Sequence, residues 1–292
     1  MTALFRIETA GERRWSRGSA ADGPTVLLDR DVTLAALLGP DGPTLADLST
    51  LPGAGDVPVD ARVVAPVDAQ EVWAAGVTYR RSRDARMEES HAPDHYDRVY
   101  DAERPELFFK ATPQRVRGTG EPIGVREDST WDVPEPELGV VIDSAGTVVG
   151  YVLGDDVSSR SIEGANPLYL PQAKVYDGSC SLGPCIVPVA AAPEHTAMRI
   201  ELRVSRDGQD VYRDEVRVDD LRHAPQTLAD WLFRGMPFPH GAILLTGTAI
   251  VPPNEFTLQP GDEVEISVDG LGVLRNPVEL VRTGPAPASD RI

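Results

Sequence analysis

The sequence predicts a mostly β (α+β) protein, with a small N-terminal α+β domain followed by a larger domain curled into a β-sandwich or roll. After Leu107, short apolar runs separated by turn residues dominate the chain, which is typical of strands joined by hairpins. The only strong helical pattern in that region covers residues 227–233, and we expect Thr227 to cap it. Packed β layers around one core are the arrangement that this pattern favours.

The expected strands of the larger domain follow one another closely. A hairpin is expected around the turn at residues 143–146, and another around the turn at residues 206–209. The predicted strands cover residues 72–75, 107–109, 139–142, 148–152, 198–204, 211–218 and 264–268, with a last strand after the turn at 270–272.

The domain boundaries are predicted from turn-rich stretches. We expect residues 1–65 to form the small domain and residues 66–284 the catalytic domain. The stretch 51–58 contains two prolines and two glycines and is the expected linker, and residues 285–292 are expected to form a flexible tail. Within the small domain we expect strands at 5–8 and 26–28 and a short helix at 34–38.

Charge and hydropathy exclude two classes of partner. The chain of 292 residues carries 28 basic and 46 acidic residues, a net charge of -18. No basic stripe is available to neutralise phosphates, so we expect no nucleic-acid partner. No apolar run approaches the ~20 residues of a membrane span, so we expect no membrane partner either.

The two cysteines are predicted to be reduced and buried. A secreted chain of this length would more often carry a disulfide framework, whereas this one has only Cys180 and Cys185. Neither has a histidine nearby in sequence, which favours a packing role over catalysis. We therefore expect a cytoplasmic protein.

Residues 80–105 differ in composition from the segments around them. They are densely charged and favour a helix at first, before a run that contains His91, Pro93 and His95. One interpretation is an exposed helical excursion, and the other is a mobile lid over an active site. The five histidines show no ligand spacing, although His91 and His95 remain candidates for the lid.

Three carboxylates are predicted to form a metal site. Glu135 and Glu137 are separated by one residue, so they share a face of an extended strand. Pro136 between them suits the start or edge of a strand. The predicted hairpin would return either Asp155 or Asp156 to the same place. Three carboxylates and water suit Mg²⁺ or Mn²⁺ better than zinc.

A lysine and a hydroxyl extend this predicted site. Beside a cation, Lys174 would have a lowered pKa and could move a proton, although an isolated lysine is more often a surface charge. Gly247 and Thr248 follow an apolar strand and could present a backbone N–H and a hydroxyl to a substrate carboxylate. A simple tight turn is the equally good alternative for this pair.

Taken in order, these motifs resemble the fumarylacetoacetate hydrolase superfamily over roughly residues 70–280. The resemblance implies a β-roll with a smaller N-terminal domain, assembled as a homodimer or homotetramer. It also implies that Mg²⁺, or in its place Mn²⁺ or Ca²⁺, lies on two Glu and one Asp, with Asp156 as the third ligand. Its carriers are Glu135-Pro136-Glu137-Leu138, residues 150–160, Gln172-Ala173-Lys174, Gly183-Pro184 and Thr246-Gly247-Thr248.

A narrower resemblance points to the 2-keto-3-deoxy-D-arabinonate dehydratase sub-group, on residues 76–110 and 162–174. It implies elimination of water from a 2-keto-3-deoxy sugar acid to give 2,5-dioxopentanoate. The 2-keto acid would chelate the metal, which as a Lewis acid stabilises the enolate formed when a C3 proton leaves. By position in the motifs, Lys174 and Glu106 would carry the proton transfers, in roles left open. Ser82, Lys110, Gly247 and Thr248 would bind substrate.

Glu163 stands where many superfamily members have Gln, a change shared with the dehydratase-like sub-group.

Three alternative functions stay open at this point. Hydrolysis of a carbon–carbon bond in an acylpyruvate would need a lid histidine such as His91 and a carboxylate. An oxaloacetate-type decarboxylase is a further possibility within the superfamily, and a non-catalytic keto-acid-binding relative is the alternative from another class.

Overall fold

The computed structural model describes residues 1–89 and 98–282 of the chain. The predicted tail and the two histidines of the predicted lid lie outside this range. Among the described residues, no helix is long and apolar enough to cross a membrane.

The strands are short and numerous. They are β1 (Thr2–Thr9), β2 (Glu12–Ser19), β3 (Gly23–Leu28), β4 (Gly53–Asp56), β5 (Arg62–Val64), β6 (Glu71–Gly76), β7 (Glu106–Ala111), β8 (Ile123–Arg126), β9 (Asp132–Val133), β10 (Pro136–Ile142), β11 (Val148–Asp156), β12 (Ser158–Ser159), β13 (Cys180–Pro188), β14 (Arg199–Arg206), β15 (Gln209–Arg217), β16 (Ala242–Leu245), β17 (Glu263–Val268) and β18 (Gly272–Val281).

The helices are few and short. The α-helices are α1 (Leu34–Leu37), α2 (Arg80–Glu89), α4 (Arg160–Ala165), α5 (Leu170–Lys174) and α6 (Pro225–Phe233). The 3₁₀ helices are η1 (Leu45–Thr50), η2 (Pro113–Arg115), η3 (Pro167–Tyr169), η4 (Val189–Ala191), η5 (His195–Ala197) and η6 (Val218–Asp220).

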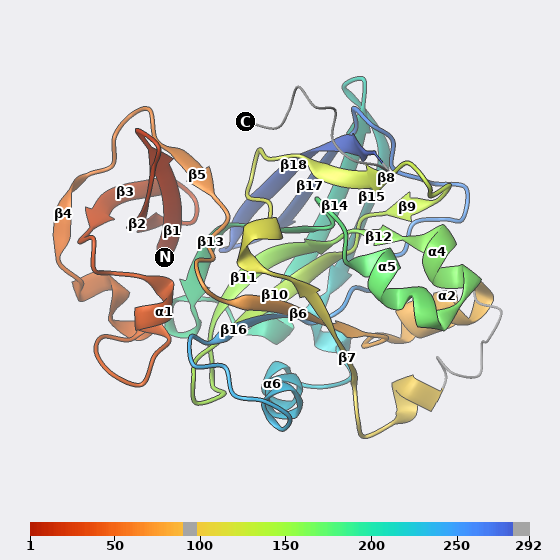
Figure 1. Cartoon of the computed structure of the whole chain (residues 1–292), viewed down its shortest axis with the longest axis horizontal. Helices are drawn as coiled ribbons and strands as arrows, with labels where there is room; N and C mark the ends of the chain where they lie inside the picture. The colour runs from red at the N-terminus through yellow and green to blue at the C-terminus, as the bar shows by residue number, and fades with distance from the viewer. Residues whose placement is uncertain (90–97, 283–292) are drawn as a thin grey trace.

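One mixed sheet of 11 strands runs through the molecule. Its order is β4-β3-β2-β1-β13-β11-β10-β16-β6-β7, and β5 pairs with β1 off this path. Figure 1 shows β1 to β5 with α1 at one end and the larger body at the other. β1 joins β13 through antiparallel pairing of Leu4 with Ile186. The N-terminal strands are therefore hydrogen-bonded to the larger body.

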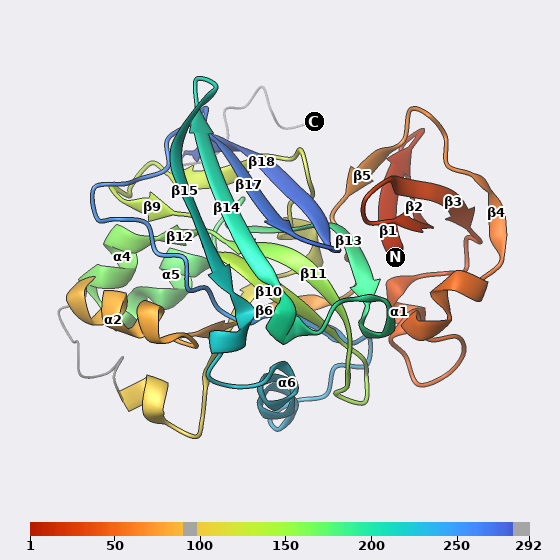
Figure 2. The ribbon, with the colours of Figure 1, turned by 180° about the vertical axis from the view of Figure 1, so that it is seen from behind.

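A second sheet covers the inner strands of the first. It has five strands in the order β15-β14-β17-β18-β8, and Figure 2 shows it from its outer side. Val140 and Leu153 of the first sheet belong to the same buried cluster as Leu202 and Ile266 of the second. The predicted mostly β sandwich or roll is thus confirmed.

The central strand β10 is buried on both faces, which explains its unbroken apolar run. Val140 points into the core between the two sheets. Val141 points the other way, into a second core that includes Leu45 and Leu48 of η1. Because no residue of β10 faces water, a carboxylate such as Glu137 at its start must find its partners inside the protein.

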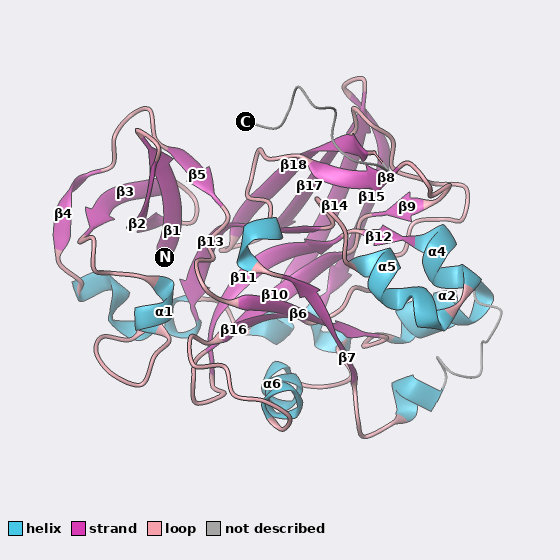
Figure 3. Ribbon diagram, in the orientation of Figure 1, coloured by secondary structure: helices cyan, strands magenta, loops and turns pink. Residues whose placement is uncertain are grey.

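Three helices gather at the end of the sandwich that lies away from the N-terminal strands. Figure 3 shows α2, α4 and α5 there, beside the small sheet of β9 and β12, while α6 lies apart from them. This end is where β11 delivers Asp155 and Asp156, and it is the end that carries the site.

Several local predictions are wrong or incomplete. The expected linker contains β4, which pairs with β3. Helix α6 begins at Pro225 after an Ala224 cap rather than at Thr227, because proline has the φ angle that a first helical residue needs. β2 has no apolar run to mark it, since Trp15 is its only large apolar residue and four of its eight residues are charged. The short helices α4 and α5 also carry too few residues to show a period.

Candidate active site

Glu135, Glu137 and Asp156 converge at the open end of the β10–β11 hairpin. One carboxylate oxygen from each lies within 4.8 Å of the other two, and all three residues are buried. The backbone N–H of Asp156 donates to the carbonyl oxygen of Glu135 at 3.0 Å, which fixes the return of the strand. Pro136 is the first residue of β10, as predicted.

The choice between Asp155 and Asp156 follows from the alternation of the strand. Asp156 contributes to the three-carboxylate cluster, whereas Asp155 points away from it. The Oδ1 atom of Asp155 instead accepts the backbone N–H of Glu135 at 2.8 Å. Burial raises the pKa of Asp155 to about 7. Asp155 therefore shapes the backbone at Glu135, and Asp156 is the third acid of the cluster.

Glu135 is the most strongly paired of the three acids. Its Oε1 atom accepts from Arg86 at 2.5 Å and from Arg160, and its Oε2 atom accepts from Lys174 at 2.5 Å. Burial by itself would raise the pKa of Glu135, but these three positive charges outweigh it and hold that pKa well below its ordinary value. Glu135 is thus a carboxylate at neutral pH.

Glu137 has the opposite environment. Its Oε2 atom accepts the backbone N–H of Gly247 at 2.6 Å, and no ion pair of the described residues includes it. Burial, together with the charges of Asp156 and Glu135, raises its pKa well above the ordinary value. A divalent cation on the cluster would offset this repulsion, and an all-oxygen donor set suits Mg²⁺. The residues present therefore fit the predicted ion.

Lys174 lies between two of the cluster's acids. Its Nζ atom is 2.5 Å from Glu135 Oε2, 2.9 Å from Asp156 Oδ2 and 2.5 Å from Ser158 Oγ. Burial lowers the pKa of Lys174, but the charges of Asp156 and Glu135 outweigh it, and the pKa is raised. The raised pKa describes Lys174 without a cation, and the lowered pKa expected beside a cation stays a prediction.

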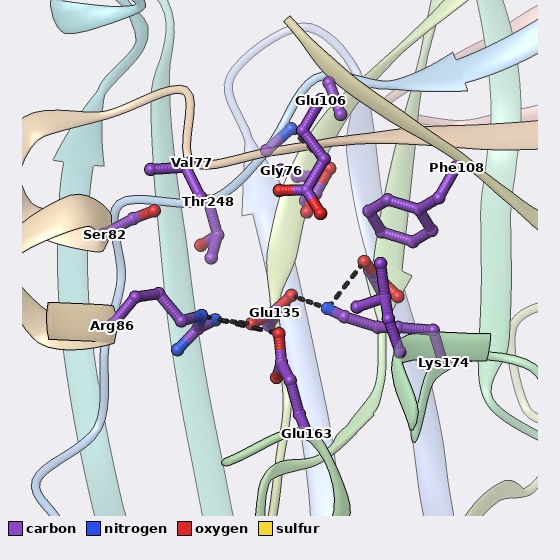
Figure 4. A pocket seen from close by; sticks show the side chains of 15 residues that line it. Gly76, Val77, Ser82, Arg86, Glu106, Phe108, Glu135, Glu163, Lys174 and Thr248 are labelled. Carbon is purple, nitrogen blue, oxygen red and sulfur yellow. Dashed lines mark hydrogen bonds and ion pairs between the residues drawn. The ribbon is translucent and has the colours of Figure 1, made fainter. Parts of the chain in front are cut away.

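A small cavity opens beside the cluster, and most of the predicted site residues line it. Figure 4 shows Glu106 and Glu163 on opposite sides, with Arg86 and Lys174 approaching Glu135 from two directions. The free space between the side chains is about 20 Å³, close to the room that one water or ion requires. The lining residues are Ala75, Gly76, Val77, Ser82, Arg86, Glu106, Phe108, Glu135, Glu137, Asp156, Glu163, Leu170, Lys174, Gly247 and Thr248.

Glu106 occupies the cavity at the first residue of β7. Burial, followed by the charge of Glu163, raises its pKa to about 7. A carboxyl group with this pKa exchanges a proton readily at neutral pH. Close packing against Gly76 holds it in place, since a Cβ at that glycine would lie 2.2 Å from Glu106 Oε2.

The backbone at Gly247 serves the cluster. Its φ angle is +95°, and a Cβ there would lie 1.9 Å from Thr78 Oγ1, so only glycine fits. The Gly247 N–H donates to Glu137 rather than to an open position. Thr248 lines the cavity next to it, while its hydroxyl accepts the Ile250 N–H at 3.1 Å.

Lys110 is the one predicted site residue that does not line the cavity. Its side chain is fully buried, with Nζ 2.5 Å from Asp156 Oδ1. The same nitrogen donates to the backbone carbonyls of Lys174 at 2.6 Å and Val157 at 3.1 Å. It therefore contacts the cluster through Asp156 without lining the cavity.

Sequence reasoning missed the arginines that neutralise the site. Arg86 of α2 and Arg160 of α4 both bind Glu135 and both lie near Glu163. Although burial acts in the opposite direction, the two guanidinium groups lower the pKa of Glu163 to about 2. Buried acids need positive partners, and both arginines stand in segments quoted for the resemblance. The need of the buried acids for positive partners was therefore the signal that could have identified Arg86 and Arg160 from the sequence.

Comparison with known proteins identifies the family of this chain. The family described as fumarylacetoacetate (FAA) hydrolase C-terminal matches residues 71–279. A probable 2-keto-3-deoxyxylonate dehydratase of Haloferax volcanii is 51% identical over 77% of this chain and 78% of its own. The 2-dehydro-3-deoxy-D-arabinonate dehydratase of Saccharolobus solfataricus is 44% identical over 76% of both chains.

A solved structure agrees with these relatives. It is a 2-keto-3-deoxy-D-arabinonate dehydratase complexed with magnesium and 2,5-dioxopentanoate. At 37% identity it superimposes with a TM-score of 0.82, covering 97% of this chain and all of the other. The chain therefore belongs to the fumarylacetoacetate hydrolase family.

Proposed function

We propose that this chain is a divalent-metal-dependent dehydratase that removes water from a 2-keto-3-deoxy sugar acid. The observation that carries the proposal is the convergence of three buried carboxylates beside Glu106 and Lys174 in one cavity. For a five-carbon acid the expected product is 2,5-dioxopentanoate, the compound found in the related solved structure. The identity to two dehydratases, 51% and 44%, supports this choice within the family.

The substrate skeleton follows from simple chemistry. The names of the two relatives specify a 2-keto-3-deoxy acid derived from xylonate and from arabinonate. Carbons 2 and 3 carry no stereocentre in such an acid, so carbon 4 is the only one left. The two names therefore describe the same connectivity and differ at most in configuration at carbon 4. A 2-keto-3-deoxypentonate is accordingly the first substrate to test.

Glu135, Glu137 and Asp156 would hold the cation, with Mg²⁺ as the expected ion and Mn²⁺ or Ca²⁺ as substitutes. When bound, the ion acts as a Lewis acid toward a chelating 2-keto acid and makes its C3 protons more acidic. Three carboxylates bring more negative charge than the cation carries. The positive charges of Lys174, Arg86 and Arg160 more than offset this surplus of one negative charge together with the charge of Glu163.

Two groups divide the proton transfers. Glu106, with a pKa of about 7, is ionised in part at neutral pH and takes the proton from carbon 3. Lys174, whose pKa is raised, is an ammonium and donates a proton to the departing C4 hydroxyl. Loss of that water leaves a C3–C4 double bond. Transfer of a proton from carbon 5 to carbon 3 then gives a C4–C5 enol, and transfer of its hydroxyl proton to carbon 4 gives the aldehyde of 2,5-dioxopentanoate.

Apolar side chains complete the cavity. Val77, Phe108 and Leu170 line it between the charged groups, and the Phe108 ring lies 5.5 Å from Lys174 Nζ. These side chains limit the water around the reacting atoms, which strengthens the electrostatic interactions there. Ser82 and Thr248 line the same space and are the residues we assign to substrate hydroxyl or carboxylate groups.

The alternatives have less support. A non-catalytic relative would have Lys174 and Glu106 turned away from the cavity, whereas both line it. Carbon–carbon bond hydrolysis is disfavoured because the relatives at 51% and 44% identity are named dehydratases. Dehydration requires only groups that line the described cavity.

A panel assay tests the proposal. The metal-stripped protein is incubated with 2-keto-3-deoxypentonate, oxaloacetate and an acylpyruvate, each with Mg²⁺ or with EDTA, and products are identified by mass. We expect loss of one water from the deoxy acid with Mg²⁺ only. Cleavage of the acylpyruvate or loss of CO₂ from oxaloacetate, with the deoxy acid untouched, would replace dehydration by the corresponding alternative.

The assembly and its location stay predictions. We propose a homodimer or homotetramer in the cytoplasm, following the family resemblance. Light scattering coupled to size-exclusion chromatography measures the mass of the assembly directly. A mass equal to one chain of 31.5 kDa would refute the predicted oligomer.

A further inference from the structure

The ammonium group of Lys110 is surrounded by protein oxygens, with two hydrogen bonds to backbone carbonyls and an ion pair to Asp156. An ammonium has three N–H donors, and three acceptors surround Nζ: Asp156 Oδ1, the carbonyl of Lys174 and the carbonyl of Val157. The side chain is 0% exposed. With two donors on backbone carbonyls and an ion pair to Asp156, Lys110 is held outside the set of residues that line the cavity.

Lysine is rare in this chain, which makes its two positions informative. Of the 28 basic residues only two, Lys110 and Lys174, are lysines, and the other 26 are arginines. Both lysines bind three oxygens from a single nitrogen, since Lys174 contacts Glu135, Asp156 and Ser158. A planar guanidinium spreads its donors over three nitrogens, whereas an ammonium directs three from one point. Lysine stands where that compact geometry is needed.

A β-bulge separates Lys110 from the residues of strand β7 that line the cavity. Residues 106 and 108 alternate along the strand and pair with Gly76 and Ala74, whereas Lys110 is the extra residue of a β-bulge between the pairs Trp73–Phe109 and Val72–Ala111. Glu106 and Phe108 line the cavity, and Lys110 does not. The two lysines form ion pairs with different oxygens of the same carboxylate, Lys110 with Oδ1 and Lys174 with Oδ2 of Asp156.

We propose that Lys110 is a positioning residue that fixes the Asp156 carboxylate and the end of helix α5. By holding Oδ1 of Asp156 it orients the other oxygen toward the cluster. By donating to the backbone carbonyl of Lys174, it fixes the backbone position from which the Lys174 ammonium reaches Glu135 and Asp156. The inference rests on the proposed function only in taking Asp156 as a metal ligand and Lys174 as a proton donor.

The direction in which Mn²⁺ affinity changes when Lys110 is replaced distinguishes a positioning role from a simple effect of its charge. Removing a positive charge beside a cation site would, by electrostatics alone, tighten cation binding. Loss of the group that orients a ligand weakens it, typically by about 10- to 100-fold. We therefore expect Lys110→Met to weaken Mn²⁺ binding by about tenfold or more, measured from the EPR signal of free Mn²⁺ without any substrate. Binding as tight as in the wild type, or tighter, would overturn the proposal.

Lys110→Arg and steady-state kinetics extend the test. This variant keeps the positive charge but not three donors at one point, so we expect it to weaken Mn²⁺ binding as well. With Mg²⁺ saturating, both variants should lose kcat by about 100-fold while KM changes little. If Lys110→Arg keeps the Mn²⁺ affinity and the kcat of the wild type, three donors on a single nitrogen are not required, and that part of the proposal is overturned. A raised KM at wild-type kcat would show a substrate contact instead of a positioning residue.

Gln70→Leu is the matched control. Gln70 is also fully buried and also makes three hydrogen bonds to backbone, with His240, Asp68 and Ala69. It precedes β6, whose far end at Gly76 reaches the cavity about 20 Å away. This variant should lower the unfolding midpoint without changing Mn²⁺ binding. Weakened Mn²⁺ binding in the control, equal to that in Lys110→Met, would assign the effect to general destabilisation and overturn the proposal.

The Mn²⁺ measurement also keeps the two claims separate. If the wild-type protein binds Mn²⁺ but converts no 2-keto-3-deoxy acid, the proposed function fails. The comparison of Lys110→Met with wild type still decides the role of Lys110, because it requires no turnover.

Discussion

The ammonium nitrogen of Lys174 lies 2.5 Å from Oε2 of Glu135, which places the proposed proton donor on a proposed metal ligand. A cation and this ammonium therefore compete for the same carboxylate. Two positive charges a few ångströms apart repel each other strongly in a buried site. The arrangement gives the first prediction.

We expect Lys174→Met to bind Mn²⁺ more tightly than the wild type and yet to lose turnover by about 10²- to 10⁴-fold, the range for general acid–base catalysis. The gain in affinity comes from removing the competing charge, and the loss of rate comes from removing the acid. Calorimetric Mn²⁺ titration and an assay at saturating Mg²⁺ measure the two effects. Unchanged turnover would show that another group protonates the leaving hydroxyl.

Glu137→Gln should abolish metal-dependent turnover while leaving the fold intact. Burial and the neighbouring acids raise the pKa of Glu137 well above its ordinary value, so its charge is costly without a cation. The neutral amide removes that cost but offers a weaker ligand. We expect the unfolding midpoint in EDTA to stay equal to or above that of the wild type.

Calorimetry and circular dichroism check this prediction together. Mn²⁺ should no longer raise the unfolding midpoint of Glu137→Gln, although it does so for the wild type, because a ligand stabilises only the state that binds it. Full activity in the variant would refute the assigned cluster.

The pH profile of kcat/KM should rise through about pH 7. The pKa of Glu106 is raised to about 7 by burial and by the charge of Glu163. As a base Glu106 must be ionised, so activity is low below this pKa and reaches a plateau above it. A profile that instead falls from about pH 6 to pH 8 would assign Glu106 as the acid.

Glu163→Gln should move that profile to lower pH. Glu163 is ionised at neutral pH, since its own pKa is about 2, and its charge is the second cause of the raised pKa of Glu106. Without the charge, Glu106 loses its proton more easily. A midpoint that stays in place or moves up would show that Glu163 does not influence the catalytic proton.

Gly247→Ala should cost more stability than Gly208→Ala, although both glycines have positive φ angles. The φ angles are +95° at Gly247 and +77° at Gly208, so both substitutions strain the backbone by about 1 kcal/mol. Only at Gly247 would the new Cβ meet another atom, Thr78 Oγ1 at 1.9 Å. Since its N–H also holds Glu137, we expect Gly247→Ala to weaken Mn²⁺ binding.

Urea unfolding of the two variants measures the difference. Gly208→Ala should keep wild-type Mn²⁺ binding because nothing lies within 4 Å of the added Cβ. Equal stabilities and equal Mn²⁺ binding for the two variants would contradict the proposed role of the Gly247 backbone.

Local pattern was enough to predict the centre of the site. The alternation of Glu135 and Glu137, followed by a hairpin that returns either Asp155 or Asp156, is contained in about twenty residues and depends on strand geometry alone. The resemblance selected Asp156 as the third acid and added Glu106 from a more distant segment, and both line the cavity.

The rest depended on tertiary contacts. Arg86 and Arg160 come from two separate helices, and only the folded chain shows that both reach Glu135. Lys110 was expected to bind substrate, but it does not line the cavity, and it is the extra residue of a β-bulge between β6 and β7 that the sequence does not mark. β4 and the start of α6 were missed for a related reason, because pairing with β3 and a proline at the first helical position outweigh weak local preferences.

The most direct test of the account is conversion of 2-keto-3-deoxypentonate by metal-stripped protein before and after Mg²⁺ is added, followed by NMR. We predict no reaction in EDTA, conversion to 2,5-dioxopentanoate on adding Mg²⁺, and no conversion by Glu137→Gln under either condition. Conversion at the same rate with and without EDTA, or no conversion by a wild-type protein that binds Mg²⁺, would contradict the proposed dehydratase.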